Sequence, residues 1–167
     1  MANLPLRIVV LGDSIMWGQG LYEHNKSSEI LRSRLQTALK PAPGPFDVTL
    51  DLSSDYPAHS GARIEPVPGE PCKTLHGEIP RESPSITFQA QSIPHPESVR
   101  LIIMNGGSDD LGMMSALDPS VDVAWIKTRA EVAFGRMQGL LVDTIGPRFP
   151  NATVVICGIY PIISGQS

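Results

Sequence analysis

The sequence contains little cysteine, and it has no long apolar run. Of 167 residues only Cys72 and Cys157 are cysteines. Two cysteines make no disulfide framework, and Cys157 lies in an apolar run typical of a buried strand, so we expect reduced thiols. No segment approaches the ~20 apolar residues of a membrane helix, and no secretion signal precedes the first strand. We therefore expect a protein without a membrane span that is either cytoplasmic or carries its targeting segment outside this sequence.

Charge is also scarce. Charged residues make up 18% of the chain, and 13 basic against 17 acidic side chains leave a net charge of −4 without a basic run, which makes nucleic acid an unsuitable partner. A soluble domain usually has ~25% charged residues, so we expect another molecule to cover part of this surface. Self-association through an exposed apolar edge of the sheet would be one way to do so. The length predicts a single domain over residues 1–167 with a core of its own.

Four short apolar runs predict β-strands, at residues 7–11, 47–52, 99–104 and 153–159. Three of them are mainly apolar, as in strands covered on both faces, whereas 47–52 alternates like an edge strand.

Helical patterns lie between these strands. Ser27 is the predicted N-cap of a helix that ends before Pro41, and Ser83–Pro84 predicts a short helix over 84–91. Asp118–Pro119 predicts the start of a long helix that Gly146–Pro147 ends. Its apolar stripe consists of Ala133, Met137, Leu140, Leu141 and Ile145. Alternating strands and helices predict an α/β protein, a three-layer sandwich around a mainly parallel sheet.

Gly12–Asp13–Ser14 directly follows the first buried strand, where ligand sites of open α/β sheets form. Gly12 permits a sharp turn, and the Asp13 carboxylate can bind nearby amides. Ser14 is then a candidate nucleophile whose own amide can donate to an oxyanion. Small polar loops also follow the second and third strands, at residues 59–62 and 105–111, so that three loops are expected to meet at one sheet edge.

With these residues the sequence resembles the SGNH hydrolases, or GDSL-type esterases and lipases. Gly12–Asp13–Ser14 is similar to the family's first block, Gly61 to the second, and residues 102–111 to the third, Gly-x-Asn-Asp. The resemblance implies hydrolysis of a small carboxylic ester through an acyl-serine intermediate on Ser14, without metal or cofactor. It also implies that the amides of Ser14 and Gly61 hold the oxyanion, while Asp13 and Asp110 support the loops.

One departure concerns the third block, where the asparagine position holds Asp109. An ionised carboxylate only accepts hydrogen bonds, so it would repel an oxyanion. Asp109 could be protonated, Ser108 could donate in a shifted register, or the two amides could suffice. We favour the two amides.

The second departure concerns the general base, which the family takes from a C-terminal Asp-x-x-His. None of the four histidines, at 24, 59, 76 and 95, has an aspartate three residues before it. The resemblance therefore implies the front portion of such a hydrolase, without the C-terminal strand and helix, and little activity. His59, in the second loop, is the candidate for a substitute base.

Two other functions remain open from the sequence. A catalytically inactive α/β domain could serve as a binding or assembly module, and a flavodoxin-like cofactor binder would use the same end of the sheet. No residue spacing suits a metal site, and His59, Cys72 and His76 do not form a zinc pattern.

Overall fold

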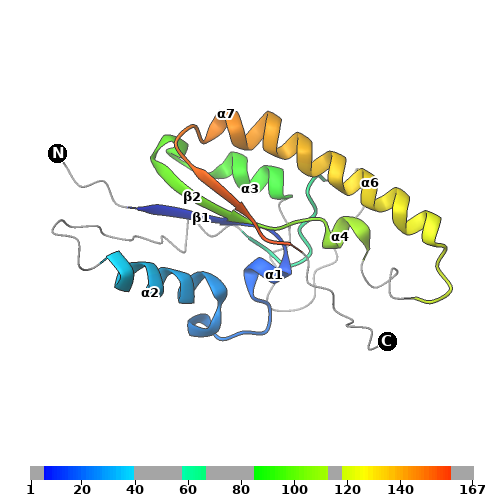
Figure 1. The fold of residues 1–167 in the computed structure, drawn as a ribbon, viewed down its shortest axis with the longest axis horizontal. Coiled ribbons are helices and arrows are strands. Elements are labelled where there is room, and N and C mark those ends of the chain that lie inside the picture. The colour runs from blue at the N-terminus through cyan, green and yellow to red at the C-terminus, as the bar shows by residue number, and fades with distance from the viewer. Residues whose placement is uncertain (1–5, 40–57, 67–84, 113–117, 159–167) are drawn as a thin grey trace.

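The computed structural model describes residues 6–39, 58–66, 85–112 and 118–158. Three parallel strands form one sheet in the order β1 (Arg7–Leu11), β2 (Val99–Met104) and β3 (Thr153–Ile156), as Figure 1 shows. Val9 lies opposite Ile102, and Ile102 lies opposite Val154. The predicted α/β class with a parallel sheet is confirmed. The predicted strand over 47–52 lies outside the described residues.

Helices cover both faces of this sheet. On one face, Ile8, Val10 and Ile103 pack with Leu31 and Leu35 of α2 (Ser27–Leu39). Met16 of the short helix α1 (Ser14–Trp17) joins the same cluster, which makes Met16 a core residue. Because side chains alternate along a strand, the neighbouring positions face the other side.

On that other face, Val9, Leu11 and Met104 pack against α3 (Ile86–Ser92) and the helical segment η3 (Leu140–Ile145). The predicted apolar stripe of the long helix points into this core: Ala133, Leu140 and Ile145 are buried, and Met137 and Leu141 pack against the cluster. Figure 1 accordingly shows three layers, with α2 on one side of the strands and α3, α6 and α7 on the other.

Two helices begin later than the sequence predicted. Ser85 caps α3, because its Oγ accepts from the amide of Phe88 at 3.2 Å, and the helix therefore does not start at residue 84. The long helix α6 (Val123–Gly139) is capped by Asp122, which accepts from the amide of Ala124 at 2.9 Å. Asp118, the predicted cap, instead accepts from the amide of Ser120 at 2.8 Å in a turn.

The predicted end of the long helix at Gly146–Pro147 is also wrong. The chain continues from α6 through the π-helical segment η3 into α7 (Gly146–Arg148). The amide of Gly146 donates to the carbonyl of Leu141, the wider pattern of a π turn. A π turn shifts the hydrogen-bond register by one residue, which lets the helix pass a proline that lacks an N–H.

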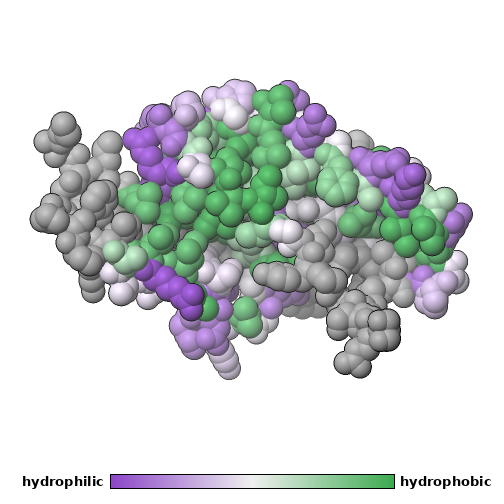
Figure 2. Space-filling model, in the orientation of Figure 1, coloured by the Kyte–Doolittle hydropathy of each residue, from purple (hydrophilic) through white to green (hydrophobic). Residues whose placement is uncertain are grey.

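The remaining helical turns are η1 (Glu23–Asn25), η2 (Pro96–Ser98) and α4 (Ser108–Leu111). Within the ranges given above, no helix combines the length and the apolarity needed to cross a membrane. β3 is one of the two outer strands among the three described, and its Val155 and Ile156 are 45% and 50% exposed. Figure 2 shows a continuous hydrophobic surface over this part of the molecule.

Candidate active site

β1 ends in a turn at Gly12 that only glycine can form. The φ angle of Gly12 is +145°, and a Cβ atom there would lie 2.1 Å from Asn105 Oδ1. The buried amide side chain of Gln89, on α3, holds the turn from both sides: Oε1 accepts from Gly12 N at 2.9 Å, and Nε2 donates to Gly12 O at 3.0 Å. The backbone before Ser14 is therefore fixed.

Asp13 is fully buried and joins the ends of two strands. Its Oδ1 accepts from the amide of Ile15 at 2.9 Å and from Asn105 Nδ2 at 2.8 Å, and its Oδ2 accepts from Ser108 Oγ. The amide of Asp13 donates to Asn105 Oδ1 at 3.2 Å. Because the Ser108 hydroxyl proton is committed to Asp13, it is not free for an oxyanion.

Ser14 is the first residue of α1 and is half-buried. Its hydroxyl makes no hydrogen bond to the described residues. Gly12 and Asp13, which precede it, are held by Gln89 and Asn105, so the Ser14 hydroxyl stands on a fixed backbone. Such an arrangement leaves the serine oxygen available to a ligand.

The second loop is tied to the turn that carries Ser14. The amide of His59 donates to Gly12 O at 3.0 Å, and Ser60 Oγ donates to Gln19 Oε1 at 2.8 Å. Gly61 follows with a φ of +76°, and no atom lies within 4 Å of the position that a Cβ would take. The loop containing Gly61 therefore lies at the same end of the sheet as Ser14, with open space on its outer side.

The third loop follows β2 and enters α4. Asp110, at its end, is buried, and its Oδ2 accepts from the amide of Ile64 at 2.9 Å while its Oδ1 pairs with Arg136 Nη1 at 2.9 Å. Arg129 donates to the carbonyl of Asp110 through Nε at 3.0 Å and Nη2 at 2.8 Å. Asp110 thus connects α4 both to α6 and to the segment that follows Gly61.

Asp109 is different, because its buried Oδ2 has no hydrogen-bond partner. Burial, followed by the charges of Asp13 and Asp110, raises the pKa of Asp109 to about 6, against a smaller lowering by Arg63. This carboxyl is therefore neutral in mildly acidic solution, whereas an ordinary aspartate is ionised there.

None of the described histidines bonds to Ser14. The ring of His59 packs on Trp17 with 5.4 Å between centroids, its Nδ1 is buried without a partner, and burial lowers its pKa. His24 stacks on Tyr22 at the surface, and His95 lies exposed beside Glu97. His76 falls outside the described residues. In the described part of the chain, no imidazole is oriented toward Ser14 by a carboxylate.

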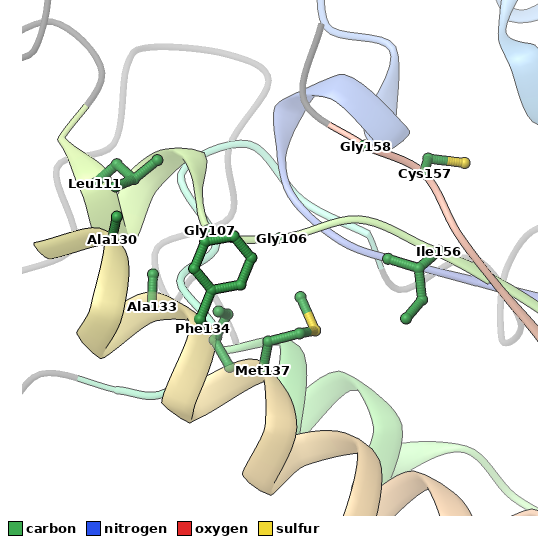
Figure 3. Close-up of a pocket in the computed structure, with 11 residues that line it drawn as sticks. Gly106, Gly107, Leu111, Ala130, Ala133, Phe134, Met137, Ile156, Cys157 and Gly158 are labelled. Atoms are coloured by element: carbon green, nitrogen blue, oxygen red, sulfur yellow. The ribbon is translucent and has the colours of Figure 1, made fainter. Parts of the chain in front are cut away.

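An apolar pocket of about 330 Å³ lies next to the third loop. Figure 3 shows Phe134 and Met137 of α6 facing Ile156 of β3 across it, with Gly106 and Gly107 at its back. A Cβ at Gly106 would lie 2.7 Å from Ile86 Cδ1, so the backbone of the loop packs closely here. Cys157, at the rim, is a free thiol.

The sequence did not single out several residues that hold this site together. Gln89 lies in a helix that was predicted only from its start signal, and Arg136 lies in the polar part of a long helix. For Gln89, the only signal in the sequence is a polar residue on the face of a short helix that otherwise points into the core. Such a residue needs a buried hydrogen-bond partner. The described residues contain no group of His, Cys, Asp and Glu arranged to hold a metal ion.

Neither a family model nor a curated protein matches this sequence. Among solved structures, the chain is similar to an extracellular lipase from Streptomyces rimosus, with 19% identity and a TM-score of 0.45. The similarity covers 90% of this chain and 58% of the lipase chain. This chain therefore spans less than two thirds of the length of that lipase.

Proposed function

We propose that the protein is a serine ester hydrolase of the SGNH type with Ser14 as its nucleophile. The main support is the state of Ser14, whose hydroxyl bonds to none of the described residues while Gln89 and Asn105 hold the backbone on its N-terminal side. The loops that contain Gly61 and Asp110 lie at the same end of the sheet and leave the side of Gly61 open.

In this proposal Ser14 Oγ gives its proton to solvent water and attacks the carbonyl carbon of an ester, and the electron pair of the C=O bond moves to the oxygen. The amides of Ser14 and Gly61 donate to the resulting oxyanion. Collapse of this intermediate breaks the C–O bond to the alkoxide, which takes a proton from solvent and leaves as the alcohol. Water then hydrolyses the acyl-serine to the carboxylic acid and the free serine hydroxyl. Asp13 and Asp110 act as supports, since each is already bonded within its loop.

Proton removal from Ser14 is the slow part of this chemistry. A positioned base contributes typically about 10²- to 10⁴-fold, and none of the described residues bonds to the Ser14 hydroxyl. We therefore expect slow turnover of p-nitrophenyl acetate by the 167-residue chain. Rapid turnover that Ser14→Ala abolishes would contradict this expectation while supporting Ser14 as the nucleophile.

The direct test is labelling by a fluorophosphonate probe, which forms a stable bond only with an activated serine. We expect a single labelled site, lost in Ser14→Ala and retained in Ser33→Ala, a matched change at an exposed serine of α2. No labelling of the intact protein at any pH between 5 and 9 would reject the proposed hydrolase.

A second candidate, an assembly module that pairs with another copy of the chain, is favoured by the apolar surface of β3. Val155 and Ile156 are about half exposed, and Phe134 is 76% exposed nearby. Sedimentation distinguishes this candidate: a dimer that Ile156→Lys dissociates would support it, and a monomer across the micromolar range would reject it.

A further inference from the structure

Gln19 connects the segment that carries Ser14 to the second loop through two hydrogen bonds. Its backbone amide donates to the carbonyl of Ser14 at 3.1 Å, and its side-chain Oε1 accepts from Ser60 Oγ at 2.8 Å. Ser60 is only 2% exposed, and a buried hydroxyl is costly to leave without a partner. Gln19 therefore bridges the residue that carries the candidate nucleophile and the residue directly before Gly61.

The second loop is a tight turn whose shape decides the direction of the Gly61 N–H. The amide of Ala62 donates to the carbonyl of His59 at 3.2 Å, and Gly61, at the third position, has a φ of +76°. Ser60, at the second position, does not have a positive φ. These values define a type II β-turn, in which the peptide between the two central residues faces the opposite side from that of a type I turn.

The central peptide of this turn carries a free donor. The N–H of Gly61 makes no hydrogen bond to the described residues, and Gly61 is exposed, with no atom within 4 Å of the position of a Cβ. If the peptide turned over, the carbonyl of Ser60 would take the place of this N–H. An acceptor would then face a negatively charged oxygen. The value of the Gly61 amide as an oxyanion donor therefore depends on how firmly Ser60 is held.

Two contacts hold the turn to the Ser14 segment, one from each side. The amide of His59 donates to Gly12 O at 3.0 Å, on the N-terminal side of Ser14, and Gln19 holds Ser60 from the C-terminal side. The bond at His59 is a backbone bond at the first residue of the turn, before the peptide that can turn over. The Gln19 contact, in contrast, acts on Ser60, which contributes the carbonyl of that peptide.

We propose that Gln19 is a positioning residue of the hydrolase, which fixes the Gly61 N–H relative to Ser14 by holding Ser60 while its own amide is bonded to Ser14. The inference rests on the proposed function and deepens it. Gln19 is exposed and acts through Ser60, so it needs no contact with the substrate. Its effect on the reaction is expected to be large for a surface residue, because a displacement of about 1 Å can lower a rate about 10²-fold.

The test compares Gln19→Leu, which removes the acceptor, with Gln19→Glu, which keeps it. A fluorophosphonate reacts with Ser14 when Oγ displaces fluoride from phosphorus and the hydroxyl proton goes to solvent. The dependence of this reaction on probe concentration gives a maximal rate and a half-saturating concentration. We expect the maximal rate of Gln19→Leu to fall at least about tenfold at an unchanged half-saturating concentration. Gln19→Glu should react like wild type.

Two further variants control for the change itself. Gln19→Ala also lacks the acceptor and should lose the same maximal rate, which keeps the proposal testable if leucine disturbs the fold. Gln138→Leu makes the same substitution at an exposed position of α6 and should react like wild type. Circular dichroism verifies that each variant is folded before its rate is compared.

A spectroscopic measurement tests the geometry independently of the rate. After complete labelling, the phosphoryl oxygen on Ser14 stands where the oxyanion would be, and an amide proton that donates to it shifts downfield in the NMR spectrum. We expect this shift at Gly61 in wild type and in Gln19→Glu, and its loss in Gln19→Leu. A residue that only stabilised the fold would not change it.

The outcomes separate the two proposals. A Gln19→Leu protein that keeps the wild-type maximal rate, or whose adduct keeps the wild-type shift of Gly61, would overturn the role of Gln19 and leave the hydrolase standing. A loss of rate that Gln19→Glu shares would do the same, because the acceptor would not be what matters. Absence of labelling in wild type would overturn the hydrolase and the role of Gln19 together.

Discussion

Asn105 and Asp13 hold each other through two hydrogen bonds, one in each direction. The amide of Asp13 donates to Asn105 Oδ1 at 3.2 Å, and Asn105 Nδ2 donates back to Asp13 Oδ1 at 2.8 Å. Both side chains are buried. This pair links the end of β1 to the end of β2, and the turn that carries Ser14 therefore depends on a residue that lies in another loop.

Asn105→Ala should destabilise the protein because it removes both bonds. The buried amide of Asp13 would then lack its partner, and the buried carboxylate would lose one of its three donors, which together costs about 2 to 3 kcal/mol. Urea unfolding followed by circular dichroism measures the change. Asn151→Ala is the matched control, since Asn151 donates to Glu97 O at the surface and should cost less than about 1 kcal/mol. Equal losses in the two variants would show that the Asp13 pair contributes little.

Gly12 and Gly61 should respond differently to the same substitution. Both have positive φ angles, but a Cβ at Gly12 meets Asn105 Oδ1 and Met16 Cγ, at 2.1 and 2.9 Å, whereas one at Gly61 meets nothing within 4 Å. Gly61→Ala should cost about 1 to 2 kcal/mol from backbone strain alone. Gly12→Ala should cost about 3 kcal/mol or more, because the new methyl group also displaces Asn105.

Thermal and urea unfolding of the two variants test this difference. Because Gly61→Ala keeps the backbone N–H, its folded fraction should still be labelled at Ser14 by a fluorophosphonate. A Gly12→Ala protein as stable as Gly61→Ala would mean that the turn can move away from Asn105.

His59 should not be the base for Ser14. A catalytic histidine is oriented by a carboxylate on one nitrogen, but Nδ1 of His59 is buried without a partner. Its ring packs on Trp17 instead. We therefore expect His59→Phe, which keeps an aromatic ring in place, to change the rate of Ser14 labelling less than tenfold. A loss of about 10²- to 10⁴-fold would identify His59 as the base after all.

The parts of this fold that depend on local sequence patterns could be predicted. One such pattern is the short apolar run of Ile8, Val9 and Val10, and another is the helical stripe that contains Ala133 and Leu140. All five of these residues are buried. Helix starts were less predictable, since Asp118 and Asp122 are equally good caps within five positions, and packing decides between them.

Contacts between distant segments could not be predicted. Gln89 is 77 residues from Gly12, and Arg136 is 26 residues from Asp110. Each side chain also fits the exposed face of a helix, so nothing in the local pattern marks it as a partner. The glycine and serine positions of the candidate site were visible in the sequence because they follow a buried strand, whereas the polar groups that hold them were not.

The pKa of Asp109 predicts how stability depends on pH, independently of any activity. In the folded protein this pKa is raised to about 6, mainly by burial, while an unfolded chain has the ordinary value of 3.8. Between these two values the folded state keeps a proton that the unfolded state releases. The free energy of unfolding therefore falls as pH rises from about 4 to 6, by about 1 kcal/mol once solvent screening of this partly exposed carboxyl is allowed for.

Asp109→Asn removes this titration, so its stability relative to wild type should increase from pH 4 to 6 and stay constant above about pH 7. Urea unfolding of both proteins at pH 4, 5, 6 and 7 measures the difference, and Glu131→Gln, at an exposed site, should show no such trend. A difference between Asp109→Asn and wild type that is the same at all four pH values would mean that Asp109 titrates alike in both states. In that case the carboxyl would be ionised in the folded protein near pH 5, and the charges of Asp13 and Asp110 would not hold its proton.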